Sequence, residues 1–298
     1  MQHLCYSYFV MRTKENQPKA IKKSTRFIGI ACMLIASFLF STGGVLIKII
    51  PWNPLAINGV RNVIAAVVIG IYIAATHHKI KVNFTVIIGA VCLAGVTTLF
   101  SVANKMTTAG NVIILQNTAP VWIVVLLFFI FGKKPTRIEL VSILIVFTGI
   151  LCFFFEGIAS GKWLGNLLAL LSGIFYAGVF MLNSFEKGDA LSSVFFGQLG
   201  CALVFSPMVV HETDFTFPVL LAVFLLGTFQ VGLAYIFFTT GTKYTDPVTA
   251  SIINAIEPIL NPTLVAIFYG EMLGPLSLVG AVIVMCGILY YNIKQAAS

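Results

Sequence analysis

Charged residues are scarce in this sequence. They make up only 9% of its 298 residues, against about 25% in an average soluble domain. Hydrophobic residues account for 59%, and the mean hydropathy is +1.00. So few charges cannot cover the surface of a water-soluble protein of this size, and the many large apolar residues exclude a disordered chain. A polytopic membrane protein is the class that remains.

Enzyme and metal signatures are also lacking. The sequence has neither His-Glu-x-x-His nor Gly-x-Ser-x-Gly, two common catalytic motifs. Residues 157–163 resemble a phosphate-binding loop, but the spacing is one residue short and Trp163 stands where Ser or Thr is needed. The six cysteines are far apart, and five lie in apolar stretches, which disfavours disulfides and thiolate metal sites. We therefore expect no enzyme activity, no cofactor and no metal.

Long apolar stretches fill most of the chain. A helix needs roughly 20 mostly apolar residues to span the hydrocarbon layer. Ten stretches fit this requirement, and residues 122–129 illustrate that they lack the alternation of a β-barrel strand. The predicted spans are 26–49, 54–75, 84–105, 109–131, 138–155, 163–184, 190–210, 218–240, 247–269 and 275–293. Residues 1–25 are expected to be a cytoplasmic leader, not a signal peptide, with Met1 or Met11 as its start.

The basic residues predict an orientation. With ten spans and a cytoplasmic N-terminus, both termini lie in the cytoplasm. Of the 18 Lys and Arg residues, only Lys48, Lys105 and Lys162 then lie outside, with Arg61 inside a span. An excess of Lys and Arg marks the cytoplasmic side. The net charge of +8 therefore predicts topology in a plasma (inner) membrane, and no nucleic-acid partner is expected.

The two halves of the chain resemble each other. A shift of 138 residues places Pro120 on Pro258 and Gly132 on Gly270, and a shift of 136 places Gly29 on Gly165. Prolines and glycines each fix a backbone feature, so these matches carry more weight than matches of Leu on Leu. Because each half has five spans, the second half enters the membrane from the opposite side. The predicted fold is all-α: ten transmembrane helices in two inverted five-helix repeats around a central cavity.

Particular motifs carry a family resemblance. Residues 247–251 precede Glu257-Pro258, Gly270-Glu271 and Gly287-Ile288, and the first half has Ala119-Pro120 and Gly132-Lys133 in the same frame. This pattern resembles the EamA-type transporters of the drug/metabolite transporter superfamily. Many repeats of this type carry Glu where the first half has Lys133, so a symmetric role for the two positions is not expected.

The resemblance covers residues 26–293 and implies an inner-membrane carrier with a central cavity. It implies a first repeat over 26–155 and a second over 156–298. It also implies movement of amino acids, other metabolites or drugs, often outward, and leaves the substrate open.

Two charged residues lie deep inside predicted spans. Charges at the bilayer centre cost about 2.5–3.5 kcal/mol each on insertion scales. Glu257 is a candidate for proton coupling, for contact with a cationic substrate group, or for a structural role at the Pro258 kink. Arg61 either binds a substrate carboxylate or has a structural role, and the two charges could also pair.

Amides and aromatics complete the candidate binding site. Gln116 and Asn254 are equivalent at the shift of 138, and each precedes its proline by four residues, so the two amides are predicted to face each other. Any one of them could instead form an interhelical hydrogen bond. The remaining candidates are Asn117, Trp122, Tyr176 and Tyr235, and Pro120 and Pro258 are predicted to be kinks or hinges.

Together these features predict a secondary-active transporter that exports a small metabolite, an amino acid or a related compound, by alternating access. Phosphorylated or nucleotide-linked metabolites and cationic drugs are alternative cargoes. A sensor or scaffold without transport is the alternative of a different class. The expected partners are the lipid bilayer, the substrate and coupling protons, and the chain is expected to be a monomer or a homodimer.

Overall fold

The computed structural model describes residues 23–132, 134–182, 187–245 and 253–296. This part of the chain is helical throughout, without a β-strand. Most of the predicted leader, the end of the sixth predicted span and the start of the ninth lie outside the described residues.

The described residues of the first half form seven helices. They are α2 (Lys23–Ser41), α3 (Gly43–Ile49), α4 (Pro54–Ala75), α5 (Phe84–Met106), α6 (Ala109–Gln116), α7 (Ala119–Phe131) and α8 (Arg137–Ala159). Side-chain caps explain several starts, because the first backbone N–H groups of a helix need acceptors. Asn53 accepts from Leu55 at the start of α4, and Thr136 and Glu139 form a capping box on α8.

The second half follows the same plan. Its helices are α9 (Trp163–Leu182), α10 (Ala190–Phe205), the 3-10 turn η1 (Ser206–His211), α11 (Phe217–Leu225), the π-helix η2 (Leu226–Leu233), α12 (Ala234–Tyr244), α14 (Glu257–Tyr269) and α15 (Pro275–Ala296). Helices α7 and α14 both have 13 residues, and each ends at a glycine in the left-handed region, Gly132 (φ 66°) or Gly270 (φ 72°). Glycine adopts this conformation without the steric cost of a Cβ atom.

Seven helical runs of the described residues are long and apolar enough to cross a membrane. They cover residues 27–49, 54–75, 84–106, 109–129, 137–159, 190–211 and 217–244. Two further apolar helical stretches, 163–179 and 275–291, are shorter, and α14 is shorter still. The chain is therefore a multi-pass helical protein, and this length criterion supports seven of the ten predicted spans.

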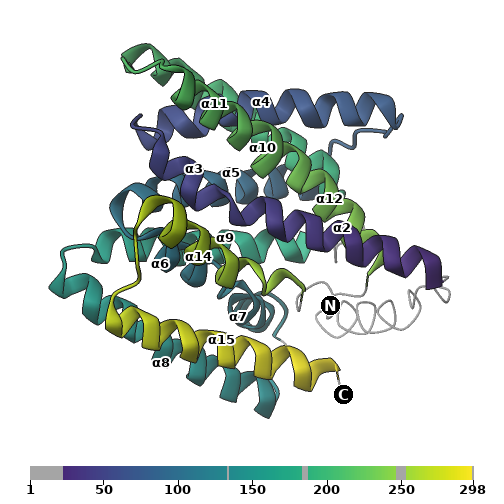
Figure 1. The fold of residues 1–298 in the computed structure, drawn as a ribbon. Helices are drawn as coiled ribbons and strands as arrows, with labels where there is room; N and C mark the ends of the chain where they lie inside the picture. The colour runs from purple at the N-terminus through teal and green to yellow at the C-terminus, as the bar shows by residue number, and fades with distance from the viewer. Residues whose placement is uncertain (1–22, 133, 183–186, 246–252, 297–298) are drawn as a thin grey trace.

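The helices pack lengthwise into one bundle (Figure 1). Helix α8 packs against α15, α4 against α10, α5 against α9, and α2 against α12. The end of the bundle where α2 begins and α15 ends is here called the terminal end, and the opposite end the far end.

Glycines allow two of these contacts to be close. An ideal Cβ on Gly29 of α2 would lie 2.9 Å from backbone atoms of Tyr244, and one on Gly165 of α9 would lie 2.9 Å from backbone atoms of Met106. Real Cβ contacts are longer than this, so a larger residue would push the helices apart.

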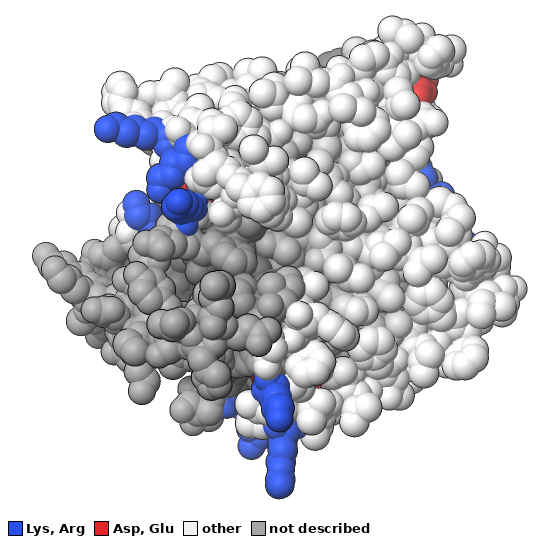
Figure 2. Space-filling view, turned by 180° about the vertical axis from the view of Figure 1, so that it is seen from behind, with Lys and Arg blue, Asp and Glu red and all other residues white. Residues whose placement is uncertain are grey.

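The surface of the bundle is suited to lipid. Large apolar side chains such as Phe84, Phe129, Phe155 and Ile267 are more than 60% exposed, which a soluble monomer rarely tolerates over a continuous area. Figure 2 shows a face that is mostly uncharged, with Lys and Arg gathered at its left side and at its lower edge. The exposed basic residues at the terminal end include Lys79, Lys81, Lys134, Arg137, Lys187 and Lys294.

Candidate functional site

Arg61 is sealed inside the bundle. Its side chain is on α4 and the residue is 1% exposed. The Nη2 group donates to Oδ1 of Asn58 at 3.1 Å and to the backbone oxygen of Thr97 on α5 at 2.9 Å. Nε has no hydrogen-bond partner among the described residues. The guanidinium also forms no ion pair with a described carboxylate. The predicted pairing of Arg61 with Glu257 is thus not formed in this structure, and Arg61 joins α4 to α5 through neutral acceptors.

Glu257 is the buried acid of the second half. It begins α14 and is 5% exposed. Among the described residues its carboxylate has neither an ion pair nor a hydrogen bond to a side chain. Ionising an acid in this position without a compensating charge is costly.

Two tyrosines lie within electrostatic range of Glu257. Tyr176 of α9 and Tyr235 of α12 both interact with this carboxylate, and Tyr235 also interacts with Arg61. The ring of Tyr235 packs edge-on against Phe40 of α2, with ring centroids 5.0 Å apart. The predicted site residues Arg61, Tyr176, Tyr235 and Glu257 therefore gather in one region, to which four different helices contribute.

The amides connect the halves, but in a different pairing from the one expected. Asn254 donates from Nδ2 to Oδ1 of Asn117 at 3.4 Å and lies close to the side chain of Tyr176. Gln116 instead donates to the hydroxyl of Ser172 on α9 at 3.2 Å. The partner of Asn254 is thus the residue next to Gln116, because the helix break after Gln116 presents Asn117 to the second half.

Trp122 lies at the edge of this arrangement. Its Nε1 group donates to Thr118 at 3.1 Å within its own helical segment, and its ring packs against Phe147 of α8 at 5.7 Å between centroids. The side chain is half-buried. The described contacts place Trp122 toward α8 and give it no contact with Glu257 or Arg61.

The two predicted kink prolines lie at helix starts. Pro120 is in the first turn of α7 and Pro258 in the first turn of α14, each directly after a break in the helical path. Proline suits the first turn because the N–H that it lacks has no intrahelical acceptor there. Pro262 is the proline inside α14, and the sequence analysis did not single it out.

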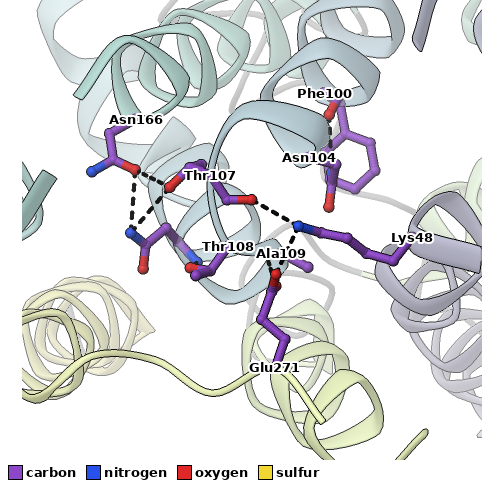
Figure 3. A network of polar contacts seen from close by, with 9 residues as sticks. Lys48, Phe100, Asn104, Thr107, Thr108, Ala109, Asn166 and Glu271 are labelled. Atoms are coloured by element: carbon purple, nitrogen blue, oxygen red, sulfur yellow. Dashed lines mark hydrogen bonds and ion pairs between the residues drawn. The ribbon is translucent and has the colours of Figure 1, made fainter. Parts of the chain in front are cut away.

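A polar network closes the far end (Figure 3). Nζ of Lys48 is 2.7 Å from Oε2 of Glu271 and donates to the backbone oxygen of Thr107 at 2.9 Å. The other oxygen of Glu271 accepts from the backbone N–H of Ala109 at 2.7 Å. Asn166 of α9 accepts from the Thr107 hydroxyl at 2.8 Å. The network joins α3, the α5–α6 connection, α9 and the segment after α14.

Several polar residues were missed by the sequence analysis. Asn58 and Asn62 flank Arg61, and Nδ2 of Asn62 donates to Oδ1 of Asn58 at 2.9 Å. Asn261 of α14 is fully buried and both of its amide atoms lack partners among the described residues. A signal was present, since Asn58 and Asn62 are four residues apart in an apolar segment and so lie on the same helix face as Arg61. The described residues contain no group of His, Cys, Asp and Glu that could hold a metal ion.

The fold and this buried polar region are those of a multi-pass α-helical membrane transporter. The model of the EamA-like transporter family matches residues 27–155 and again residues 163–293. The chain belongs to the EamA-like transporter family, as the sequence motifs predicted.

Relatives agree with this assignment. The chain is 26% identical over 276 residues to the uncharacterized transporter YwfM of Bacillus subtilis (strain 168), covering 86% of this chain and 91% of the relative. It is also 26% identical over 213 residues to an uncharacterized transporter of Clostridium kluyveri, with 66% and 68% covered. A protein solved by crystallography has the same fold, with a TM-score of 0.63 at 16% identity over 92% of this chain and 98% of the other.

Proposed function

We propose that this chain is a secondary-active transporter that exports a small metabolite, an amino acid or a related compound, by alternating access. The observation that carries the proposal is the Glu257 carboxylate, which is buried where side chains of both halves meet and has no ion pair with another described residue. Intramembrane acids of this kind serve substrate and proton pathways in transporters. Glu257 is accordingly proposed as the coupling residue.

The proposed architecture is ten spans in two inverted repeats, over residues 26–155 and 156–298. The helix boundaries support it, because α7 and α8 begin at residues 119 and 137, and α14 and α15 begin 138 residues later. Helix α5 ends at Met106 and α12 at Tyr244, which are also 138 residues apart.

The packing supports the same symmetry. Gly29 approaches Tyr244, and its equivalent Gly165 approaches Met106. In the same way an added Cβ on Gly149 would meet Val284, and one on Gly287 would meet Val146. Each contact recurs with the roles of the two halves exchanged, which is what a two-fold axis between the halves requires.

The proposed substrate site comprises the cluster around Glu257 and the amides that lie next to it. It contains Arg61, Gln116, Asn117, Trp122, Tyr176, Tyr235, Asn254 and Glu257, with Pro120 and Pro258 at the breaks that permit movement. The exposed basic residues at the terminal end favour a plasma membrane location with both termini in the cytoplasm.

Phosphorylated cargo is less compatible with this site. Phosphate groups are bound by several Lys or Arg side chains, whereas Arg61 is the one buried basic residue among those described. Cationic drugs remain an alternative because Glu257 is acidic. A sensor or scaffold would have the same fold but would move no solute.

Flux measurements test the proposal. Purified protein in proteoliposomes should exchange labelled amino acids, and a pH gradient should drive accumulation. Glu257→Gln should abolish the proton-driven accumulation. Flux and pH dependence equal to those of the native protein would contradict the coupling role, and absence of any solute flux would favour the sensor or scaffold.

A further inference from the structure

We propose that the central site recognises the ammonium end of its substrate at Glu257 and does not require a substrate carboxylate. This inference rests on the proposed transport function and specifies its substrate class: primary amines and amino acids, recognised through the amine.

The charges of the site are divided unequally between the halves. At the shift of 138 the counterpart of Glu257 is Ala119, and that of Tyr235 is Thr97. At the shift of 136 the counterpart of Tyr176 is Phe40. The acid and both tyrosine hydroxyls therefore come from the second half.

The acidic side lacks a cation. Glu257 is buried and has no ion pair among the described residues. Tyr176 and Tyr235 lie within its electrostatic range, and Phe40 packs against Tyr235. A buried carboxylate without a counter-charge matches an ammonium group, because the ammonium supplies the missing charge and donates hydrogen bonds to the carboxylate.

The basic side, by contrast, has a role within the protein. Nη2 of Arg61 is hydrogen-bonded to Asn58 and to the backbone oxygen of Thr97, and Asn58 is in turn held by Thr98 at 2.9 Å. Nε has no partner among the described residues, but Arg61 is only 1% exposed, so a substrate carboxylate could reach it only by opening the packing of α4 against α5. Arg61 is therefore a positioning residue in this proposal.

Matched ligands test separately whether the amine and the carboxylate of the substrate are recognised. Phenylalanine, phenethylamine and hydrocinnamate share one skeleton, and the last two lack the carboxylate and the amine respectively. Leucine, isoamylamine and isocaproate form a second set. Binding to the purified full-length protein is measured by thermal shift and calorimetry. In at least one set the amine should bind within about threefold of the amino acid, and the acid at least about tenfold more weakly.

Variants tie the result to Glu257. Glu257→Gln should weaken amine binding by about tenfold or more, since the counter-charge is lost. Glu212→Gln, the same change in a loop at the far end, should leave it unchanged. If Glu257→Gln does not fold, Glu257→Asp keeps the charge and should retain measurable amine binding, and the ligand sets on the native protein remain decisive.

The outcomes separate the inference from the proposed function. Equal binding of acid and amine, or no amine binding in either set, would overturn the inference. Amine binding that depends on Glu257 without any flux would support the inference and refute the transporter. If the protein transports an amino acid, and hydrocinnamate or isocaproate inhibits this flux while the amines do not, the transporter is supported and the inference is refuted.

Discussion

Lys48 and Glu271 form an ion pair that joins the two halves of the chain at the far end, with Nζ and Oε2 2.7 Å apart. Glu271 also accepts from the first backbone N–H of α6, so one carboxylate holds both the end of α3 and the start of α6. At the shift of 138 its counterpart is Lys133. The second half therefore has an acid at this position, and the first half has a base.

A double-mutant cycle on this pair should reveal the coupling. Lys48→Met and Glu271→Gln are each expected to lower the stability of the purified protein, and the coupling energy should be about 0.5–3 kcal/mol. Additive effects, measured by thermal unfolding in detergent, would contradict this account.

Glycine substitutions should distinguish close helix contacts from open positions. An ideal Cβ on Gly59 of α4 would lie 2.3 Å from backbone atoms of Phe205 and Ser206. Gly59→Ala should therefore destabilise the protein by about 1–3 kcal/mol. Gly200→Ala is the matched control, since its Cβ would meet nothing within 4 Å and alanine favours helix. Equal melting temperatures for the two variants would refute the packing described for α4 and η1.

The contact between His78 and Asp189 at the terminal end should depend on pH. Nε2 of His78 lies 2.9 Å from Oδ2 of Asp189. Burial raises the pKa of Asp189, but hydrogen bonds from Ser192 and His78 outweigh it, so this pKa lies below its ordinary value.

Because the pKa is lowered on folding, the carboxylate contributes stability above its ordinary pKa of about 3.9 and loses it as the pH falls through the lowered value. Asp189→Asn should therefore reduce the melting temperature near neutral pH, and the difference from the native protein should shrink below about pH 4. A difference independent of pH would contradict the role of the Asp189 charge.

The buried amides should affect substrate affinity to different degrees. Asn254→Ala removes the bond to Asn117 at a position three residues before Glu257 and should weaken binding by about tenfold, since a buried partner is left unsatisfied. Gln116→Ala removes one bond, to Ser172, and should have a smaller effect. Thr263→Ala, at an exposed position of α14, is the control. Unchanged Kd values in both amide variants would show that the site lies elsewhere.

Much of the site region could be predicted from the sequence, while the pairings could not. Glu257, Arg61, Tyr176 and Tyr235 were recognisable because polar or aromatic groups in apolar spans need a partner or a function. The choice of Asn117 over Gln116 as the partner of Asn254 depends on the helix break after Gln116, which changes the direction of the side chains that follow. Asn58, Asn62 and Asn261 became evident only through their burial and contacts.

The sequence by itself determined that the chain is a multi-pass helical membrane protein of the EamA-like family, because apolar length and the repeated Pro and Gly positions are local properties. Only the tertiary structure decided that Arg61 and Glu257 do not pair, that Tyr235 lies within electrostatic range of both, and that Lys48 meets Glu271. Apart from Tyr235 and Glu257, these residues are more than 150 positions apart, and their relationships depend on how the helices pack, which local pattern does not encode.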